Sequence, residues 1–124
     1  MIMANLVAVP ATKLRIFLVD DDTHRHRPLY QVILKLLHEA DIESAVVFKG
    51  CEGFGARRVI HTDRIELLSF SLPLIIEATD SPEKIEAAAP RIANILGSGL
   101  IEITRCTIVR PPLETGNRKL ETTS

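Results

Sequence analysis

Cysteine is scarce in this sequence, which contains 2 such residues, Cys51 and Cys106. They lie far apart and lack the close spacing of metal-ligand pairs, so the sequence predicts neither a disulfide framework nor a zinc site of the usual kind. Free thiols are typical of proteins in a reducing compartment. We therefore expect a cytoplasmic protein whose cysteines stay reduced.

The sequence also has no excess of either charge and no long apolar run. Its formal net charge is −1 at pH 7, so bulk attraction to nucleic acid or anionic lipid is not expected, and any anion site or peripheral membrane contact must be local. No run reaches the ~18 apolar residues of a membrane span, and the first residues lack the cationic region of a signal peptide. These absences favour one soluble domain, for which 124 residues suffice.

Branched apolar residues predict four strands, and apolar residues spaced by three and four predict two helices. In chain order these elements are a strand over residues 13–20, a helix over 28–40, strands over 44–50 and 72–79, a helix over 80–96 and a strand over 100–110. Pro90 lies inside the second helix and is expected to kink it. Around a domain of residues 13–110, we expect residues 1–12 to be an N-terminal extension and residues 111–124 a flexible tail.

The order of the elements is that of the α+β, ferredoxin-like βαββαβ fold. In this fold two helices cover one face of a four-stranded antiparallel sheet and leave the other face open. The predicted strands are apolar on both sides, because Leu14 and Ile16 alternate with Phe17, and Ile76 alternates with Ile75. A closed ring of subunits with inward-facing sheets would bury the second side. Whether Phe17 or Ile75 matters more to that ring depends on the strand register.

A long interval separates the second and third predicted strands, and residues 49–64 at its start read KGCEGFGARRVIHTDR. About twenty residues connect these strands, whereas a hairpin loop takes ~2 to 5, so the interval is expected to be functional. Gly50 and Gly55 have the spacing of a P-loop, but the lysine and the serine or threonine of that motif are missing. A dinucleotide fingerprint is also excluded, because Arg58 occupies the place of its third glycine.

What remains is a glycine-rich bend next to fixed positive charge. Backbone amides that Gly50, Gly53 and Gly55 leave accessible can converge on an anion, and forked guanidinium groups can neutralise it. The polar side chains of this stretch that suit an anion are those of Lys49, Arg57, Arg58, His61 and Arg64. The alternative is a wide turn or bulge whose arginines extend into solvent.

A second polar cluster, DDDTHRH, covers residues 20–26. Its aspartates and histidines could ligate a divalent metal, but such residues at a strand end are usually solvated, and we predict no metal site. Arg25 and Arg27 stand just before a helix, where contact with an anion is about as reasonable as a metal site.

Covalent chemistry has one candidate group. Cys51 stands beside Glu52 and near His61 in the sequence, but a buried, inert thiol is the simpler interpretation. We therefore predict no catalytic residue.

A set of short motifs runs from about Lys13 to Val109. It comprises Arg27-Pro28-Leu29-Tyr30, Gly50-Cys51-Glu52-Gly53-Phe54-Gly55, His61-Thr62, Leu68-Ser69, Leu72-Pro73, Glu77, Asp80, Lys84-Ile85 and Pro90. In these motifs the sequence resembles the bacterial domain-of-unknown-function family 190, which is similar in fold to the PII signal-transduction proteins. The resemblance implies a homotrimer of ferredoxin-like subunits whose sheets face inward. It also implies that residues 49–64 form the root of a T-loop, which in PII proteins contacts partner proteins and helps to form clefts for adenine nucleotides between subunits.

The resemblance predicts a non-catalytic regulatory trimer that binds a small anionic ligand, most readily an adenine nucleotide, and acts through its loop on a protein target. The expected ligand-binding residues are Lys49, Gly50, Gly53, Gly55, Arg57, Arg58, His61, Arg64 and Arg27. Tyrosine modification, known in some PII loops, cannot be transferred, because the only tyrosine is Tyr30 in the first helix. The alternative is a divalent-metal-binding trimer that resembles the cation-tolerance family.

Overall fold

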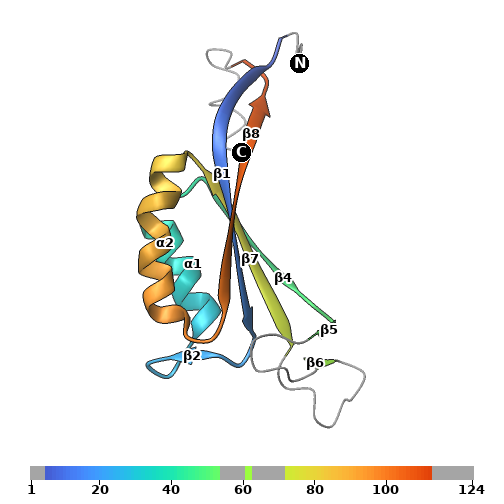
Figure 1. Ribbon diagram of the computed structural model, residues 1–124, viewed down its shortest axis with the longest axis vertical. Helices are drawn as coiled ribbons and strands as arrows, with labels where there is room; N and C mark the ends of the chain where they lie inside the picture. Colours follow the sequence, from blue (N-terminus) through green and yellow to red (C-terminus); the bar gives the residue numbers. More distant parts are fainter. Residues whose placement is uncertain (1–4, 54–60, 63–71, 113–124) are drawn as a thin grey trace, which may run out of the picture.

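The computed structural model describes residues 5–53, 61–62 and 72–112 of the chain. Its elements are β1 (Val7–Val19), β2 (Thr23–His24), β3 (Arg27–Pro28), α1 (Leu29–Glu39), β4 (Ser44–Lys49), β5 (Glu52–Gly53), β6 (His61–Thr62), β7 (Pro73–Asp80), α2 (Pro82–Leu96) and β8 (Leu100–Arg110). The four long strands form one antiparallel sheet in the order β4-β7-β1-β8, and both helices lie against one of its faces (Figure 1). This arrangement confirms the predicted ferredoxin-like fold.

The first strand is longer than its sequence signal indicates. β1 begins at Val7 rather than at Lys13, so residues 7–12 of the expected N-terminal extension pair with the last strand, from Val7 opposite Arg110 to Thr12 opposite Arg105. Pro10 lacks an amide donor, but at this position β1 pairs with β8 and not with β7, whose pairing begins at Thr12. The partner strand β8 nevertheless continues to Arg110, and the two strands form a ribbon that extends past the helices (Figure 1).

The first helix forms where the apolar spacing predicts it. α1 starts directly after Pro28, and the buried side chains Leu29, Ile33 and Leu37 follow one another at four-residue spacing on one side. This spacing matches the helical repeat, so a single stripe of α1 faces the sheet.

The second helix has clear signals at both ends. The Ser81 hydroxyl accepts a hydrogen bond from the Lys84 amide at 3.4 Å, Pro82 occupies the first turn, and Gly97 follows the helix with a φ of 71°. α2 continues through Pro90 as one helix, with the proline on its exposed side. No helix in the described part of the chain is long and apolar enough to cross a membrane.

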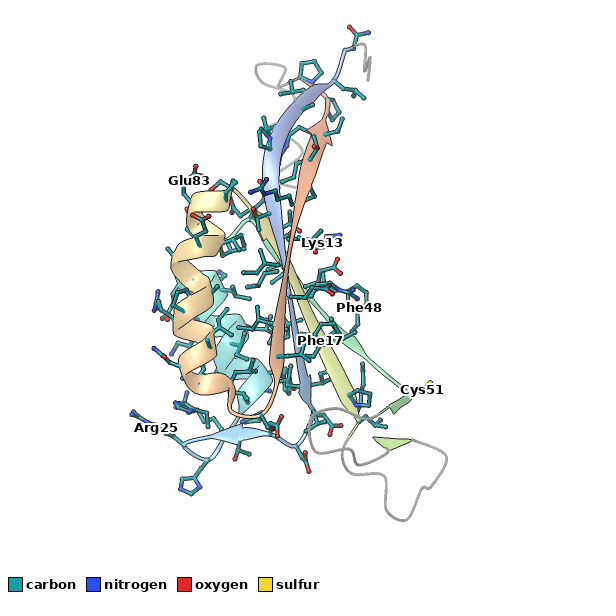
Figure 2. The ribbon with its side chains drawn as sticks, viewed as in Figure 1. Lys13, Phe17, Arg25, Phe48, Cys51 and Glu83 are labelled. Atoms are coloured by element: carbon teal, nitrogen blue, oxygen red, sulfur yellow. The ribbon has the colours of Figure 1, made fainter. Side chains whose placement is uncertain are left out.

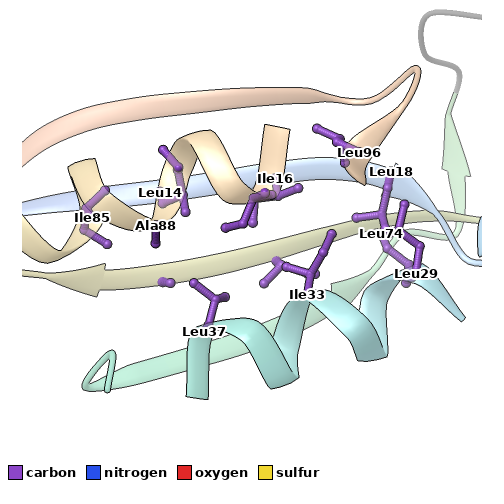
Figure 3. Close-up of a cluster of buried hydrophobic side chains, with 14 residues drawn as sticks. Leu14, Ile16, Leu18, Leu29, Ile33, Leu37, Leu74, Ile85, Ala88 and Leu96 are labelled. Atoms are coloured by element: carbon purple, nitrogen blue, oxygen red, sulfur yellow. The ribbon is translucent and has the colours of Figure 1, made fainter. Parts of the chain in front are cut away.

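The hydrophobic core lies between the helices and the sheet (Figure 3). Its fully buried large side chains are Leu14, Ile16, Ile33, Leu37, Ile76, Ile85 and Ile92. They come from β1, β7 and both helices, so each element contributes to one contiguous core. Replacing one of them by alanine is expected to cost ~2–5 kcal/mol.

The open face of the sheet carries a row of apolar side chains. Phe17 is the cross-strand partner of Ile75 on β7 and of Leu100 on β8, and Ile75 is also paired with Phe48 on β4. Phe48 and Leu100 are 50% and 54% exposed, and Figure 2 shows Phe17 and Phe48 on the side of the sheet opposite the helices. The expected second apolar side is therefore present, and the register gives Phe17 and Ile75 the same face.

A row of charged side chains crosses the same face next to the apolar row. Nε of Arg15 lies 3.3 Å from Oε2 of Glu77, an ion pair without hydrogen-bond geometry, and Nη1 lies 3.5 Å from Oε1 of Glu102. Lys13 Nζ lies 3.8 Å from Glu77 Oε1, and the Arg15 guanidinium is 5.5 Å from the centre of the Phe17 ring. The open face is therefore mixed, with its charges compensated within the sheet.

Candidate functional site

Asp20, at the end of β1, joins the two ends of the long connection between β4 and β7. Its Oδ2 lies 3.4 Å from Nζ of Lys49, the last residue of β4. Its Oδ1 accepts a hydrogen bond from the Leu72 amide at 3.0 Å, and its own amide donates to the Leu72 carbonyl at 2.9 Å. The loop root, here Asp20, Lys49 to Gly53, His61, Thr62 and Leu72, is thus tied to the core sheet from both sides.

Gly50 fixes the close approach of the two chain segments at the loop root. Its amide donates to the carbonyl of Pro73 at 2.7 Å. A Cβ atom at this position would lie 2.7 Å from Cγ of Pro73, nearer than real Cβ contacts allow. The Gly50 amide is therefore occupied within the chain, so the glycine shapes the root and is not the free anion donor that its sequence suggests.

Two more predicted site residues face each other across a short ladder. β5 and β6 pair antiparallel, with Gly53 opposite His61 and Glu52 opposite Thr62. Residues 53 and 61 therefore belong to one local structure, which the sequence spacing does not reveal. The remaining predicted residues of the stretch, Gly55, Arg57, Arg58 and Arg64, lie outside the described residues.

Cys51 is exposed and unpaired at the loop root. The expectation of a buried thiol was therefore wrong, because β4 ends before this residue and no core element covers it. An exposed thiol is open to reagents, and its exposure alone does not make it a nucleophile.

Arg27 lies apart from the loop root within the chain. It belongs to the β2–β3 hairpin, which lies below the helices in Figure 1, whereas β5 and β6 lie at the other side of the molecule. Figure 2 shows the same separation between Arg25 and Cys51. In a single chain Arg27 is therefore apart from the described part of the loop root, because the hairpin projects under α1 after β1 ends.

The aspartates that resembled metal ligands form hydrogen bonds that stabilise the end of β1. Asp22 Oδ2 accepts a hydrogen bond from the Val19 amide at 3.0 Å, and the Asp22 carbonyl accepts one from the Leu29 amide at 2.8 Å. In the described ranges no three or more histidine, cysteine, aspartate or glutamate side chains gather closely enough to hold a metal. The geometry therefore gives the metal interpretation of residues 20–26 no support.

A polar cluster that sequence reasoning treated only as a helix start lies at the far end of the sheet. Asp80 accepts hydrogen bonds from the amides of Ser81 at 2.6 Å and Glu43 at 2.7 Å, and Lys84 Nζ lies 3.8 Å from its Oδ2. Arg110 donates to both carboxylate oxygens of Glu43, at 2.9 and 3.1 Å. Partial burial raises the pKa of Asp80, but these amides and cations outweigh it and hold the pKa below its ordinary value of 3.8.

Comparison with known proteins identifies the relatives of this chain. The family model DUF190, described as uncharacterized ACR, matches residues 11–108. The UPF0166 protein MJ1524 of Methanocaldococcus jannaschii is 36% identical over 103 residues, which cover 82% of this chain and 94% of that protein. A UPF0166 protein of Aquifex aeolicus is 34% identical over 73 residues, or 59% of this chain and 70% of that protein.

Solved structures of CPII from Thiomonas intermedia K12, a nitrogen regulatory PII-like protein, share the fold. CPII bound to ADP, AMP and acetate matches with a TM-score of 0.62 and 16% identity, over 85% of this chain and 94% of CPII. The apo form of CPII matches with a TM-score of 0.58 and 15% identity, over 86% and 99% of the two chains. Identities this low show a similarity of fold alone, and the shared fold is PII-like. The family match and the archaeal relative go further, and the chain belongs to the DUF190 family.

Proposed function

We propose that this protein is a PII-like regulatory protein that binds a small anionic ligand, most readily an adenine nucleotide, at its loop root. The observation that carries the proposal is the arrangement of that root, where Lys49 and the Gly53–His61 backbone pair lie at the base of the segment that contains Arg57 and Arg58. The likeness to CPII supports the ligand class, since CPII has been solved with ADP, AMP and bicarbonate.

The ion pair between Lys49 and Asp20 offers a route from ligand to loop. The Lys49 side chain is 59% exposed, so a bound phosphate can approach its ammonium group and compete with the Asp20 carboxylate. Asp20 also holds Leu72 at the other end of the loop. A ligand that draws Lys49 away from Asp20 therefore acts on a residue that anchors both ends of the connection, and the loop can pass this change to a protein target.

The homotrimer implied by the resemblance to PII proteins is part of the same proposal. The apolar row Phe48, Ile75, Phe17 and Leu100 supports it, because burial against other subunits would remove this row from water. The neighbouring charges compensate one another within the chain, so they enter an interface already paired; they are those of Lys13, Arg15, Glu77 and Glu102. Clefts between subunits would then border the loop roots.

Binding and signalling need no covalent step, so the proposed protein is non-catalytic. The proposal places it in the cytoplasm, where its free cysteines would stay reduced. We test ligand binding by thermal shift and calorimetry with ADP, AMP, ATP and bicarbonate, with and without magnesium. A nucleotide at a hundred times its Kd should raise the melting temperature by several degrees, since it stabilises the folded state by ~2.7 kcal/mol.

Variants assign the binding to the loop root. Arg57→Gln and Arg58→Gln should each weaken nucleotide binding by about ten- to a hundred-fold, because each removes a charge-assisted hydrogen bond. Arg91→Gln, at an exposed position on α2, is the matched control and should bind like the native protein. The proposal is wrong if no nucleotide or bicarbonate shifts the melting temperature, or if the loop variants bind nucleotide as the native protein does.

A further inference from the structure

The β2–β3 hairpin turns through two residues with an uncommon backbone conformation. His24 and Arg27 are cross-strand partners, so Arg25 and His26 alone form the turn. Their φ angles are 51° and 69°, as the primed turn of a two-residue hairpin requires. Asparagine and glycine are the usual residues in such a turn, because a larger side chain is strained in the left-handed region. Strained backbone of this kind gathers at ligand sites.

The hairpin and the outer side of α1 line a pocket of about 400 Å³ that is open to solvent. Its lining residues are His24, Arg25, Arg27, Gln31, Val32 and Lys35. This volume lies within the range of sites that hold small organic ligands. Arg25 stands on the hairpin, on the opposite side of the molecule from Cys51 (Figure 2), so the pocket is separate from the loop root of the same chain.

The positive charges of this pocket have no partner in the described part of the chain. Arg25, Arg27 and Lys35 form no ion pair or hydrogen bond there, and Asp21 and Asp22, just before the hairpin, do not line the pocket. Many other basic side chains do have carboxylate partners, namely Lys13, Arg15, Lys49, Lys84 and Arg110. The hairpin pocket therefore concentrates uncompensated positive charge in a chain whose net charge is −1.

We propose that the hairpin pocket is a second anion site, which binds the pyrophosphate group of a small phosphorylated molecule. Two guanidinium groups match the paired oxygens of neighbouring phosphates, and the Lys35 ammonium adds a third charge. Val32 and the aliphatic stems of the basic side chains supply an apolar wall, against which an organic part of the ligand can pack. A concave pocket of this size fits a small molecule better than it fits a membrane surface or a nucleic acid.

Inorganic pyrophosphate is the probe for this site, measured by isothermal titration calorimetry at low ionic strength. Arg25→Gln combined with Arg27→Gln should weaken pyrophosphate binding at this site by at least about tenfold, and Lys35→Gln should weaken it less. Arg91→Gln serves as the matched surface control and should bind as the native protein does. The proposal fails if the double variant binds pyrophosphate like the native protein.

The turn itself provides a variant that separates lost binding from lost folding. Arg25→Asn with His26→Gly keeps the primed turn and relieves its strain, so this variant should melt at a higher temperature than the native protein. It should nevertheless bind pyrophosphate at least about tenfold more weakly, because it removes a guanidinium group. Native affinity in this stabilised variant would overturn the assignment of Arg25 to the site.

The loop root and the hairpin pocket can be distinguished in the same experiment. Arg57→Gln with Arg58→Gln should leave pyrophosphate binding at the hairpin intact. If these loop variants abolish all pyrophosphate binding while the hairpin variants retain it, the hairpin proposal is wrong and the loop-root function stands. Anionic vesicles complete the test, since protein that binds vesicles through the hairpin but does not bind pyrophosphate would show a membrane contact instead.

Discussion

Oδ2 of Asp20 lies 3.4 Å from Nζ of Lys49, so the end of β1 and the end of β4 meet at the base of the long connection. The Asp20 side chain is 20% exposed and that of Lys49 is 59% exposed, so the ion pair itself contributes at most ~1 kcal/mol to stability. The part-buried hydrogen bond from the Leu72 amide to Asp20 Oδ1 is the stronger restraint. Asp20 is thus a structural anchor. Its negative charge also repels any anion that approaches Lys49.

Substitution of Asp20 can separate these two contributions. Asp20→Ala should lower the free energy of unfolding by ~1–3 kcal/mol, because it leaves the Leu72 amide without its acceptor. Asp20→Asn retains an acceptor oxygen and removes only the charge, so it should cost less than ~1 kcal/mol. Urea denaturation of both variants measures the difference. Equal losses would mean that the charge, and not the hydrogen bond, holds the loop root.

Gly50→Ala should destabilise the protein through a steric clash. The new Cβ would lie 2.7 Å from Pro73 Cγ and 3.3 Å from the Pro73 carbonyl oxygen, and overpacking of this kind costs ~1–3 kcal/mol. Pro73→Ala in the same chain should recover part of the loss. Gly97→Ala is the control, since its φ of 71° makes it strained with no atom within 4 Å. Recovery of Gly97→Ala by Pro73→Ala would rule out the clash as the cause.

Phe17→Asp should dissociate the proposed trimer. Phe17 and its partner Ile75 lie in the apolar row of the open face. Burying an additional carboxylate there should cost several kcal/mol even beside Arg15, whose guanidinium is already paired with Glu77 and Glu102. Sedimentation equilibrium should give the mass of three native chains at micromolar concentration and a smaller mass for the variant. Ala87→Asp, on the exposed side of α2, should remain trimeric. A native protein that is monomeric at every concentration would remove the ring model.

Protonation of Asp80 in acid should lower the free energy of unfolding. Because its folded-state pKa lies below its ordinary value of 3.8, the ionised carboxylate stabilises the folded protein above that value, and this stability is lost as the pH falls through the folded-state pKa. Asp80→Asn should therefore flatten the decrease in the free energy of unfolding below about pH 4. Urea denaturation from neutral to acid pH measures it, with the exposed Glu39→Gln as the comparison. An unchanged acid slope in Asp80→Asn would contradict the assignment.

The sequence by itself determined the two helices, the four long strands and their order, but neither the early start of β1 nor the short strands β2, β3, β5 and β6. Alternating apolar residues in β1 and four-residue spacing of Leu29, Ile33 and Leu37 in α1 are local patterns, and each pattern fits one secondary structure. The ends of α2 are also local, since Ser81 caps its start and Gly97 follows its end. From these elements the ferredoxin-like fold follows, because few topologies join elements in this order without crossed connections.

The tertiary structure alone decided which distant residues meet. The sheet register joins Asp20 to Lys49 and Phe17 to Ile75. Because β8 extends to Arg110, this side chain lies within hydrogen-bonding distance of Glu43. The hairpin after β1 places Arg27 apart from the loop root. Pairing between strands depends on how the whole chain packs, and a shift of one residue would exchange the two faces of a strand. The spacing of apolar residues in the sequence indicates the conformation of neighbouring residues. A site is formed by distant residues, which come together only when the chain folds.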